Sequence, residues 1–159
     1  MEFNFATLWE KTADLIPNET AIICGDEQKT WGEYENVSAK LATALIDAGL
    51  STYSKAGLYL HNSNEYLEAQ FSIFKIGGTP INVNYRYKSE ELLYLLDNSD
   101  CEALFYQACY GDQINKIKDS LPKIKAWIEV ADGSDSVVEN CVHYSSLIEQ
   151  CSEMERWNR

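Results

Sequence analysis

The sequence has few of the residues that usually mark a metal or catalytic site. Its 159 residues include two histidines, and its five cysteines form no C-x-x-C pair. That spacing argues against a metal site or a dithiol redox centre, so we interpret the cysteines as reduced, mainly structural thiols. The sequence also lacks the patterns G-x-S-x-G and H-E-x-x-H, which argues against two common kinds of hydrolase site.

Long hydrophobic runs and basic charge are also scarce. Nowhere do about 18 apolar residues occur together, and the first residues lack the basic region of a secretory signal. Thirteen basic residues against 25 acidic ones give a net charge of −12, which opposes non-specific binding to nucleic acid or anionic lipid. We therefore expect a cytoplasmic protein with no transmembrane segment and no nucleic acid partner.

The composition is typical of one folded domain. Hydrophobic residues make up 45% of the chain and charged residues 24%, as in soluble globular proteins. At 159 residues the chain can bury one core, and it is too short for two domains of ordinary size.

Apolar residues at three- and four-residue steps predict the helices. Asn4 is placed to cap the first helix, Thr30 and Glu33 have the spacing of a capping box, and Asn64 is predicted to cap a third helix. The buried face of the first helix is predicted from Leu8, Trp9, Thr12 and Leu15 or Ile16. The predicted helices cover residues 5–16, the segment between Thr30 and Gly49, residues 65–76, the segment that begins at Ser89, and residues 110–121 and 145–151.

Short apolar runs bounded by polar residues predict the strands. They lie at residues 20–24, 56–60, 101–106 and 125–130, with a short returning strand at 29–31 after a turn over 25–28. Strands that alternate with helices through short connections imply parallel pairing and right-handed crossovers. The predicted fold is therefore α/β, a three-layer sandwich with a mostly parallel sheet.

Residues 71–84 are predicted to join a helix to a strand in the middle of a βαβ unit. Gly77 can close the helix in the left-handed conformation, and Gly78 has no Cβ where backbones approach closely. Pro80 prevents further helix, and the β-branched Ile81 and Val83 alternate with asparagines as in a strand.

Polar residues follow the predicted strands at the edge where open parallel sheets bind ligands. They are His61, Asn62, Asn64, Asn82, Asn84, Arg86, Gln107 and Asp132. They could line a cleft, or they could be loop residues and helix caps, which is the commoner role of asparagine at such positions. Residues 85–87, Tyr-Arg-Tyr, could likewise clamp an anionic ligand or pack against neighbouring rings.

Phosphate-binding loops are missing from the sequence. Neither G-x-x-x-x-G-K-[ST] nor a G-x-G-x-x-G after a strand occurs, which argues against a self-contained nucleotide-binding domain. A flavodoxin-like receiver or mononucleotide binder is a weaker alternative. The sequence has neither the glycine-rich phosphate loop nor the clustered acidic pocket that such a protein would need.

Two motifs resemble those of a known superfamily. Thr30-Trp31-Gly32-Glu33-Tyr34 is similar to Thr-Tyr-x-Glu-Leu, and residues 74–82, Phe-Lys-Ile-Gly-Gly-Thr-Pro-Ile-Asn, are similar to Leu-Lys-Ala-Gly-Gly-x-x-x-Pro-x-Asn. These are the first two core motifs of the adenylate-forming superfamily of acyl-CoA synthetases, luciferases and peptide-synthetase adenylation domains. Residues 82–87 and 91–99 most resemble fatty acyl-CoA synthetases, and the resemblance extends from about residue 5 to residue 130.

The resemblance implies a parent enzyme that is an acid–CoA ligase. Such enzymes use ATP and Mg²⁺ to convert a carboxylic acid to an acyl-adenylate and then transfer the acyl group to coenzyme A. The family's catalytic motifs are a Thr/Ser/Gly-rich loop that ends in Pro-Lys, a Gly-Tyr-Gly-x-Thr-Glu motif, a Thr-Gly-Asp motif and a lysine of a C-terminal domain. None of them occurs before Arg159. No catalytic, cofactor-binding or metal-binding residue is therefore assigned in this chain.

The leading hypothesis is that residues 1–159 are a partial AMP-binding domain, the N-terminal fragment of an acyl-CoA synthetase, inactive by itself and without a cofactor of its own. Its partners would be the remaining polypeptide and, through it, a fatty or other carboxylic acid. The alternative is a stand-alone, non-catalytic binding or regulatory protein. The wide apolar circumference of the predicted helix 65–76 further predicts an exposed apolar face and self-association of the isolated chain.

Overall fold

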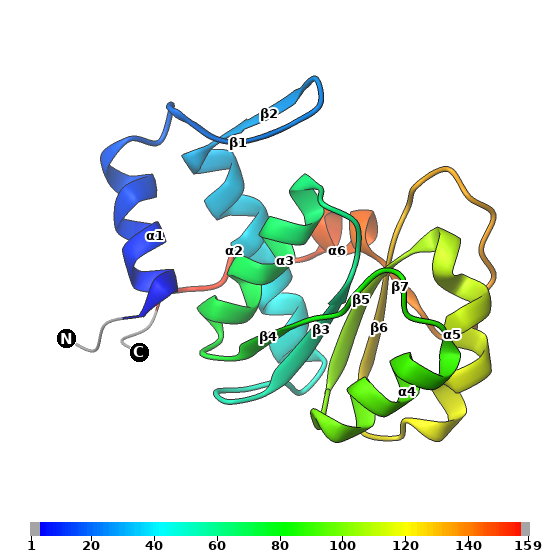
Figure 1. Cartoon of the computed structure of the whole chain (residues 1–159). Helices are drawn as coiled ribbons and strands as arrows, with labels where there is room; N and C mark the ends of the chain where they lie inside the picture. The colour runs from blue at the N-terminus through cyan, green and yellow to red at the C-terminus, as the bar shows by residue number, and fades with distance from the viewer. Residues whose placement is uncertain (1–3, 157–159) are drawn as a thin grey trace.

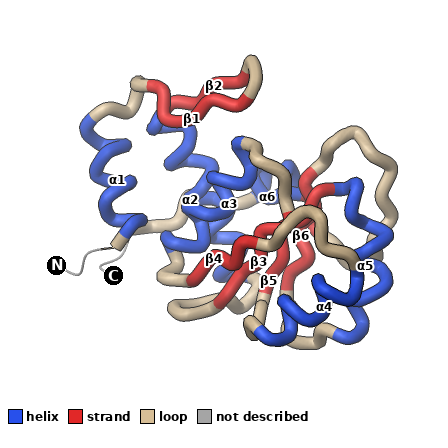
Figure 2. Tube along the Cα trace, viewed as in Figure 1, coloured by secondary structure: helices blue, strands red, loops and turns tan. Residues whose placement is uncertain are grey.

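A five-stranded parallel sheet forms the centre of the chain (Figures 1 and 2). The computed structural model describes residues 4–156. Its sheet has the order β4-β3-β5-β6-β7, and all neighbouring strands are parallel. The strands are β3 (Lys55–Tyr59), β4 (Thr79–Asn82), β5 (Ala103–Gln107), β6 (Ala126–Val130) and β7 (Val142–His143).

Helices cover both faces of this sheet (Figure 1). One face packs against α2 (Trp31–Asp47), α3 (Asn64–Lys75) and α6 (Tyr144–Gln150), and the other against α4 (Ser89–Asn98) and α5 (Gly111–Ile117). Successive residues of a strand serve opposite faces, because Phe105 belongs to the first core and its neighbour Leu104 to the second. The α/β three-layer sandwich with a parallel sheet is thus confirmed. Within residues 4–156, no helix is long and apolar enough to cross a bilayer.

An N-terminal helix and hairpin pack beside the α2–α3 layer. Helix α1 (Phe5–Leu15) is followed by the antiparallel strands β1 (Thr20–Cys24) and β2 (Glu27–Thr30). The side chain of Asn4 accepts a hydrogen bond from the Ala6 backbone N–H at 2.8 Å, which confirms the predicted cap. A small core of Ala6, Ile22, Tyr34 and Phe71 joins these elements to α2 and α3.

The predicted face of α1 is only partly right, since Trp9 packs against Tyr34 and Phe71 as a residue of that face but the leucines do not. Leu8, Leu15 and Ile16 are 45%, 80% and 42% exposed, while the buried residues are Ala6, Glu10 and Ala13. The buried side carries the Glu10 carboxylate because it forms an ion pair with the buried Lys75 of α3. A pattern of apolar residues cannot reveal such a pair.

Several boundaries also differ from the prediction. The turn after β1 is shorter, since Gly25 takes φ +60° and β2 already begins at Glu27. Ser63 rather than Asn64 caps α3, because its hydroxyl accepts from the Tyr66 N–H at 3.2 Å. The predicted helix 110–121 is divided into a 3₁₀ turn (Ala108–Tyr110), α5 and a second 3₁₀ turn (Lys118–Ser120). The two-residue strand β7 was not predicted.

The predicted joint between α3 and β4 is confirmed. Gly77 has φ +71°, and a Cβ on Gly78 would lie 2.8 Å from the carbonyl oxygen of Ser54. Only glycine lets α3 end this close to the chain that enters β3. The joint therefore sets the position of β4 against β3, with Ile81 opposite Gly57.

Helix α3 is covered within the chain. It contacts α1, α2, β1 and the strands β3 and β4, and its apolar residues Phe71 and Ile73 are fully buried. The expectation that its wide apolar surface stays exposed is therefore wrong. The exposed apolar side chains of this region lie on and beside α1 and on β1 instead, at Phe5, Leu8, Leu15, Ile16 and Ile23.

Candidate functional site

The order of the sheet reverses between β3 and β5. From β3 the chain crosses to β4 on one side, and β5, β6 and β7 then follow on the other side. Loops diverge at such a switch point, and open α/β sheets bind ligands there, beyond the carboxyl ends of the strands. The candidate site therefore lies after Tyr59 of β3 and Gln107 of β5.

The structure brings two predicted site residues together at this point. The His61 backbone N–H donates to the side-chain oxygen of Gln107 at 2.9 Å. The His61 Nε2 atom lies 2.9 Å from the hydroxyl oxygen of Tyr110, and the Tyr85 ring lies 4.7 Å from the imidazole, centroid to centroid. Tyr110 was missed as a site residue because its sequence position indicated only the start of a helix.

Two stacked tyrosine rings lie at this edge of the sheet. Tyr59 and Tyr110 stack with centroids 4.2 Å apart, and the Tyr59 hydroxyl donates to the backbone carbonyl of Tyr87 at 2.5 Å. Burial raises the pKa of each of these two tyrosines to about 12. Both hydroxyls are therefore protonated at neutral pH, and that of Tyr59 serves as a hydrogen-bond donor.

A charged group of each sign borders the tyrosines. The Arg86 guanidinium lies 5.4 Å from the Tyr85 ring centroid, within range of a cation–π contact. Asp132 accepts from the Cys109 and Ser134 backbone N–H groups at 3.1 and 3.0 Å. Partial burial opposes ionisation of Asp132, but hydrogen bonds from Cys109 and Ser134 outweigh it and lower its pKa. Partial burial of the thiol and the Asp132 carboxylate raise the pKa of Cys109 to about 11.

The predicted asparagines have structural roles. Asn64 donates to the Glu27 carboxylate at 3.2 Å and so ties α3 to the hairpin. Asn84 accepts from the Arg86 backbone N–H at 3.0 Å, which stabilises the turn after β4. The Asn62 carbonyl accepts a weak hydrogen bond from the Cys24 thiol at 3.8 Å, and Asn82 is an exposed residue of the edge strand.

The residues at this edge do not form a binding site for a nucleoside triphosphate. Such a ligand needs several positive charges or a glycine-rich loop of backbone donors, and the sequence has no such loop. The ionised Asp132 would repel phosphate, and the His61 imidazole is engaged by the Tyr110 hydroxyl. The residues offer aromatic faces and one guanidinium, an arrangement suited to stacking and not to acid–base chemistry.

The second sequence motif and the residue that follows the first one meet in a buried ionic network on the other side of the sheet. Lys75 of the second motif is fully buried, and its Nζ donates to Glu10 at 2.8 Å and to Glu35 at 2.7 Å. Glu35 follows the first motif directly, and it also pairs with Arg156 at 3.1 Å. Arg156 in turn pairs with Asp14 at 2.7 Å. The network therefore joins α1, α2, α3 and the segment after α6.

Hydrogen bonds explain the remaining residues of the first motif. The Thr30 hydroxyl accepts from the Glu33 N–H at 3.2 Å, and the Glu33 carboxylate accepts from the Thr30 N–H at 2.8 Å, so the predicted capping box is confirmed. Hydrogen bonds from Thr30 lower the pKa of Glu33. The Tyr34 hydroxyl donates to the Leu67 carbonyl at 3.0 Å. In this chain both motifs thus position helices.

Known proteins are similar to almost the whole chain. The sequence model of the family described as "AMP-binding enzyme" matches residues 9–154. A protein named as a medium/long-chain-fatty-acid–CoA/3-oxocholest-4-en-26-oate–CoA ligase, from Mycobacterium marinum, is 42% identical over 132 residues that cover 83% of this chain and 24% of that protein. A protein of the same name from Mycolicibacterium smegmatis is 38% identical over 154 residues, which cover 96% of this chain and 28% of that protein.

A solved structure shares the fold. An anthranilate CoA ligase in complex with anthranoyl-AMP matches with a TM-score of 0.87 and 21% identity, over 99% of this chain and 30% of that chain. The chain spans about a quarter of the length of the curated relatives it matches, at 24% and 28%. The α/β sandwich described above thus corresponds to the N-terminal subdomain of a larger architecture.

Proposed function

Because the chain belongs to the AMP-binding enzyme family over residues 9–154, we propose that it is the N-terminal subdomain of an acyl-CoA ligase whose catalytic residues lie in further polypeptide. The whole enzyme would convert a carboxylic acid with ATP and Mg²⁺ to an acyl-adenylate and then to an acyl-CoA. In this proposal residues 1–159 are a partial domain, and they lack the family's catalytic motifs. The enzyme would act in the cytoplasm.

The observation that carries the proposal is the similarity to relatives named as ligases. The identity of 42% extends over most of this chain, and both relatives described above carry names of CoA ligases. We infer that the substrate is a medium- or long-chain fatty acid or the carboxylic acid of a steroid, the acids in those names. The same names favour a ligase over a stand-alone binding or regulatory protein.

The buried network supports a structural role for this part of the enzyme. Inside the α-helical layer, Lys75 of the second family motif pairs with Glu35, the residue directly after the first motif. The edge at the switch point offers stacking surfaces and no phosphate cradle. The subdomain would therefore contribute a rigid wall, and the missing polypeptide would supply the groups that bind and stabilise the adenylate.

The proposal includes a partner surface. Exposed apolar residues on and beside α1 and on β1 include Phe5, which is 57% exposed, and Ile23, which is 65% exposed. We infer that the remaining polypeptide covers this surface, and that without it the chain self-associates. Sedimentation and binding of a hydrophobic dye test this point, and a monomer that binds no dye contradicts it.

Pyrophosphate exchange tests the lack of intrinsic catalysis. The purified chain is incubated with ATP, Mg²⁺, labelled pyrophosphate and medium- or long-chain acids, beside the complete Mycobacterium marinum ligase as the positive control. We expect exchange from the control and none above background from the chain. Robust exchange by the chain alone would refute the proposal.

A chimera tests the positive half of the proposal. In the Mycobacterium marinum ligase, the matched 132-residue segment is replaced by the corresponding residues of this chain. A folded chimera that forms acyl-CoA supports the proposal. A folded chimera without activity, combined with saturable binding of an acyl ligand by the chain alone, would favour the binding protein instead.

A further inference from the structure

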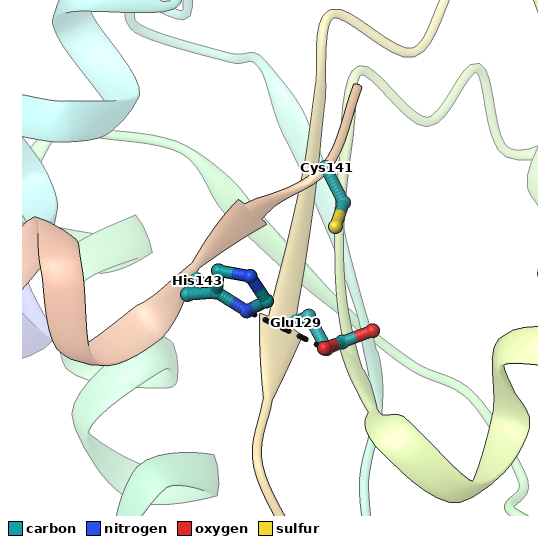
Figure 3. Close-up of side chains that lie close together, drawn as sticks. All are labelled: Glu129, Cys141 and His143. Carbon is teal, nitrogen blue, oxygen red and sulfur yellow. Dashed lines mark ion pairs between the residues drawn. The ribbon is translucent and has the colours of Figure 1, made fainter. Parts of the chain in front are cut away.

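Three side chains with metal-binding atoms converge beside the last two strands of the sheet (Figure 3). They are Glu129 of β6, His143 of β7 and Cys141, which directly precedes β7. One carboxylate oxygen, the sulfur and one imidazole nitrogen all lie within 4.8 Å of one another. The cluster lies outside the stacked tyrosines of the candidate site and outside the network of Lys75.

The register of the sheet creates this cluster. Glu129 and His143 are directly paired across the parallel β6–β7 ladder, so their side chains leave the same face of the sheet. Cys141 precedes His143 by two residues, and residues two apart in an extended chain also share a face. Figure 3 shows the Cys141 sulfur pointing toward the Glu129 carboxylate, while the His143 ring approaches it from the side. Backbone pairing therefore places the three side chains on the same face of the sheet.

The carboxylate is held in place by its neighbours. Glu129 is 6% exposed, and its Oε2 accepts from the Tyr106 hydroxyl at 3.1 Å and from the Ser136 hydroxyl at 2.7 Å. Its other oxygen, Oε1, faces the His143 Nδ1 atom at 3.4 Å. Hydrogen bonds from a surrounding shell orient the ligands of protein metal sites in this way.

The distances fit a small tetrahedral cation. With bonds of about 2.3 Å to sulfur and about 2.1 Å to nitrogen and oxygen, tetrahedral Zn²⁺ separates its ligand atoms by roughly 3.4–3.6 Å. The distance of 3.4 Å between Glu129 and His143 already has this value. The Cys141 sulfur lies within 4.8 Å of the other two ligand atoms, so it must move closer to them when the metal binds.

The types of ligand favour a transition metal such as zinc over Mg²⁺ and Ca²⁺. Thiolate and imidazole are ligands of borderline-soft metals, and together with one carboxylate they exclude Mg²⁺ and Ca²⁺, which take oxygen ligands. Access is open, since the His143 side chain is 63% exposed and a pocket of about 360 Å³ adjoins Glu129 and His143. The cluster is therefore open to solvent on the side of His143.

We propose that Glu129, Cys141 and His143 form a Zn²⁺ site with three protein ligands and one water. On binding, the Cys141 thiol releases its proton to the solvent and a Zn–S bond forms, while the His143 imidazole binds in its neutral form. Together the three ligands displace all but one of the waters of the hydrated ion. The site ties the edge strand β7 to the buried strand β6.

Cobalt substitution tests the site on the 159-residue chain. The reduced, EDTA-treated chain is titrated with Co²⁺ and followed by absorption, because cobalt bound to a thiolate gives a charge-transfer band and tetrahedral cobalt gives visible bands. We expect both bands to saturate at one equivalent and to vanish when Zn²⁺ displaces the cobalt. Absence of the charge-transfer band would overturn the proposal.

Variants assign the ligands. Cys141→Ser is expected to remove the charge-transfer band, and His143→Ala, at an exposed position, is expected to weaken Co²⁺ and Zn²⁺ binding at least about 10-fold. Cys151→Ser and His61→Ala are the matched controls, and both are expected to bind as the unchanged chain does. Circular dichroism of each variant verifies the fold. A band that survives in folded Cys141→Ser, or that disappears in either control, would contradict the assignment.

A second readout separates metal binding from folding. Zn²⁺ bound only by the native state raises Tm. We expect Zn²⁺ to raise the Tm of the unchanged chain and of Cys151→Ser but not that of His143→Ala. An equal rise in all three would place the zinc elsewhere and overturn the proposal.

Discussion

Lys75→Met is expected to destabilise the chain strongly. The Lys75 ammonium is completely buried and serves the carboxylates of Glu10 and Glu35 at 2.8 and 2.7 Å. Methionine has a similar length, so the substitution removes the charge and leaves little empty space. The side chains of Glu10 and Glu35 are only 7% and 13% exposed, so solvent compensates poorly for the lost cation.

The expected loss is about 3–5 kcal/mol, the usual cost of removing one partner from a buried ion pair. That is a large share of the roughly 5–15 kcal/mol by which domains are stable. For a urea m-value of about 2 kcal/mol/M, a loss of 4 kcal/mol lowers the unfolding midpoint by about 2 M. Urea unfolding followed by circular dichroism measures this shift.

Two comparisons isolate the buried charge. Lys123→Met removes an exposed ammonium that lies 2.7 Å from Asp100, with the two side chains 56% and 64% exposed, and it is expected to leave the urea midpoint almost unchanged because solvent screens the pair. Lys75→Met combined with Glu10→Gln is expected to regain part of the loss, because a neutral amide needs no cation. Equal midpoints for Lys75→Met and Lys123→Met would refute the reasoning.

Two further predictions concern a glycine and a cysteine. Gly78→Ala, whose Cβ would lie 2.8 Å from a backbone oxygen, is expected to cost about 1–3 kcal/mol in urea unfolding. Gly25→Asn, at an exposed turn with φ +60° that asparagine tolerates, should change stability by less than about 0.5 kcal/mol, and equal losses would contradict the close approach at Gly78. Cys109 is exposed, but its pKa is raised to about 11. The fraction of its thiol in the reactive thiolate form therefore rises as the pH approaches that value. At pH 8 we expect it to react with iodoacetamide roughly 100-fold more slowly in the native chain than in urea, and equal rates by mass spectrometry would contradict the raised pKa.

The parts of the fold that depend on local sequence were predictable. The capping box of Thr30 and Glu33 lies within one helical turn, and Gly77 takes the positive φ expected of a glycine at the end of a helix. The sheet was predictable as well, because strands buried on both faces appear as short apolar runs. Each of these features needs only neighbouring residues or a repeating pattern.

The features that the sequence did not reveal depend on distant partners. Glu10 is buried because Lys75, 65 residues later, neutralises it, so the predicted face of α1 was partly wrong. His61 meets Tyr110 across 49 residues, and β7 has two residues whose strand character comes only from pairing with β6. The same pairing joins Glu129 to the pair of Cys141 and His143. Such contacts follow from sheet order and register, which periodicity does not specify.

The measurement that tests the central claim most directly is the sequence of the native reading frame beyond the codon of Arg159. The account predicts an open frame that soon encodes a Thr/Ser/Gly-rich loop ending in Pro-Lys, the phosphate-binding element that this chain lacks. A stop codon directly after Arg159 would contradict it, since the chain would then be a complete protein without the residues for adenylation.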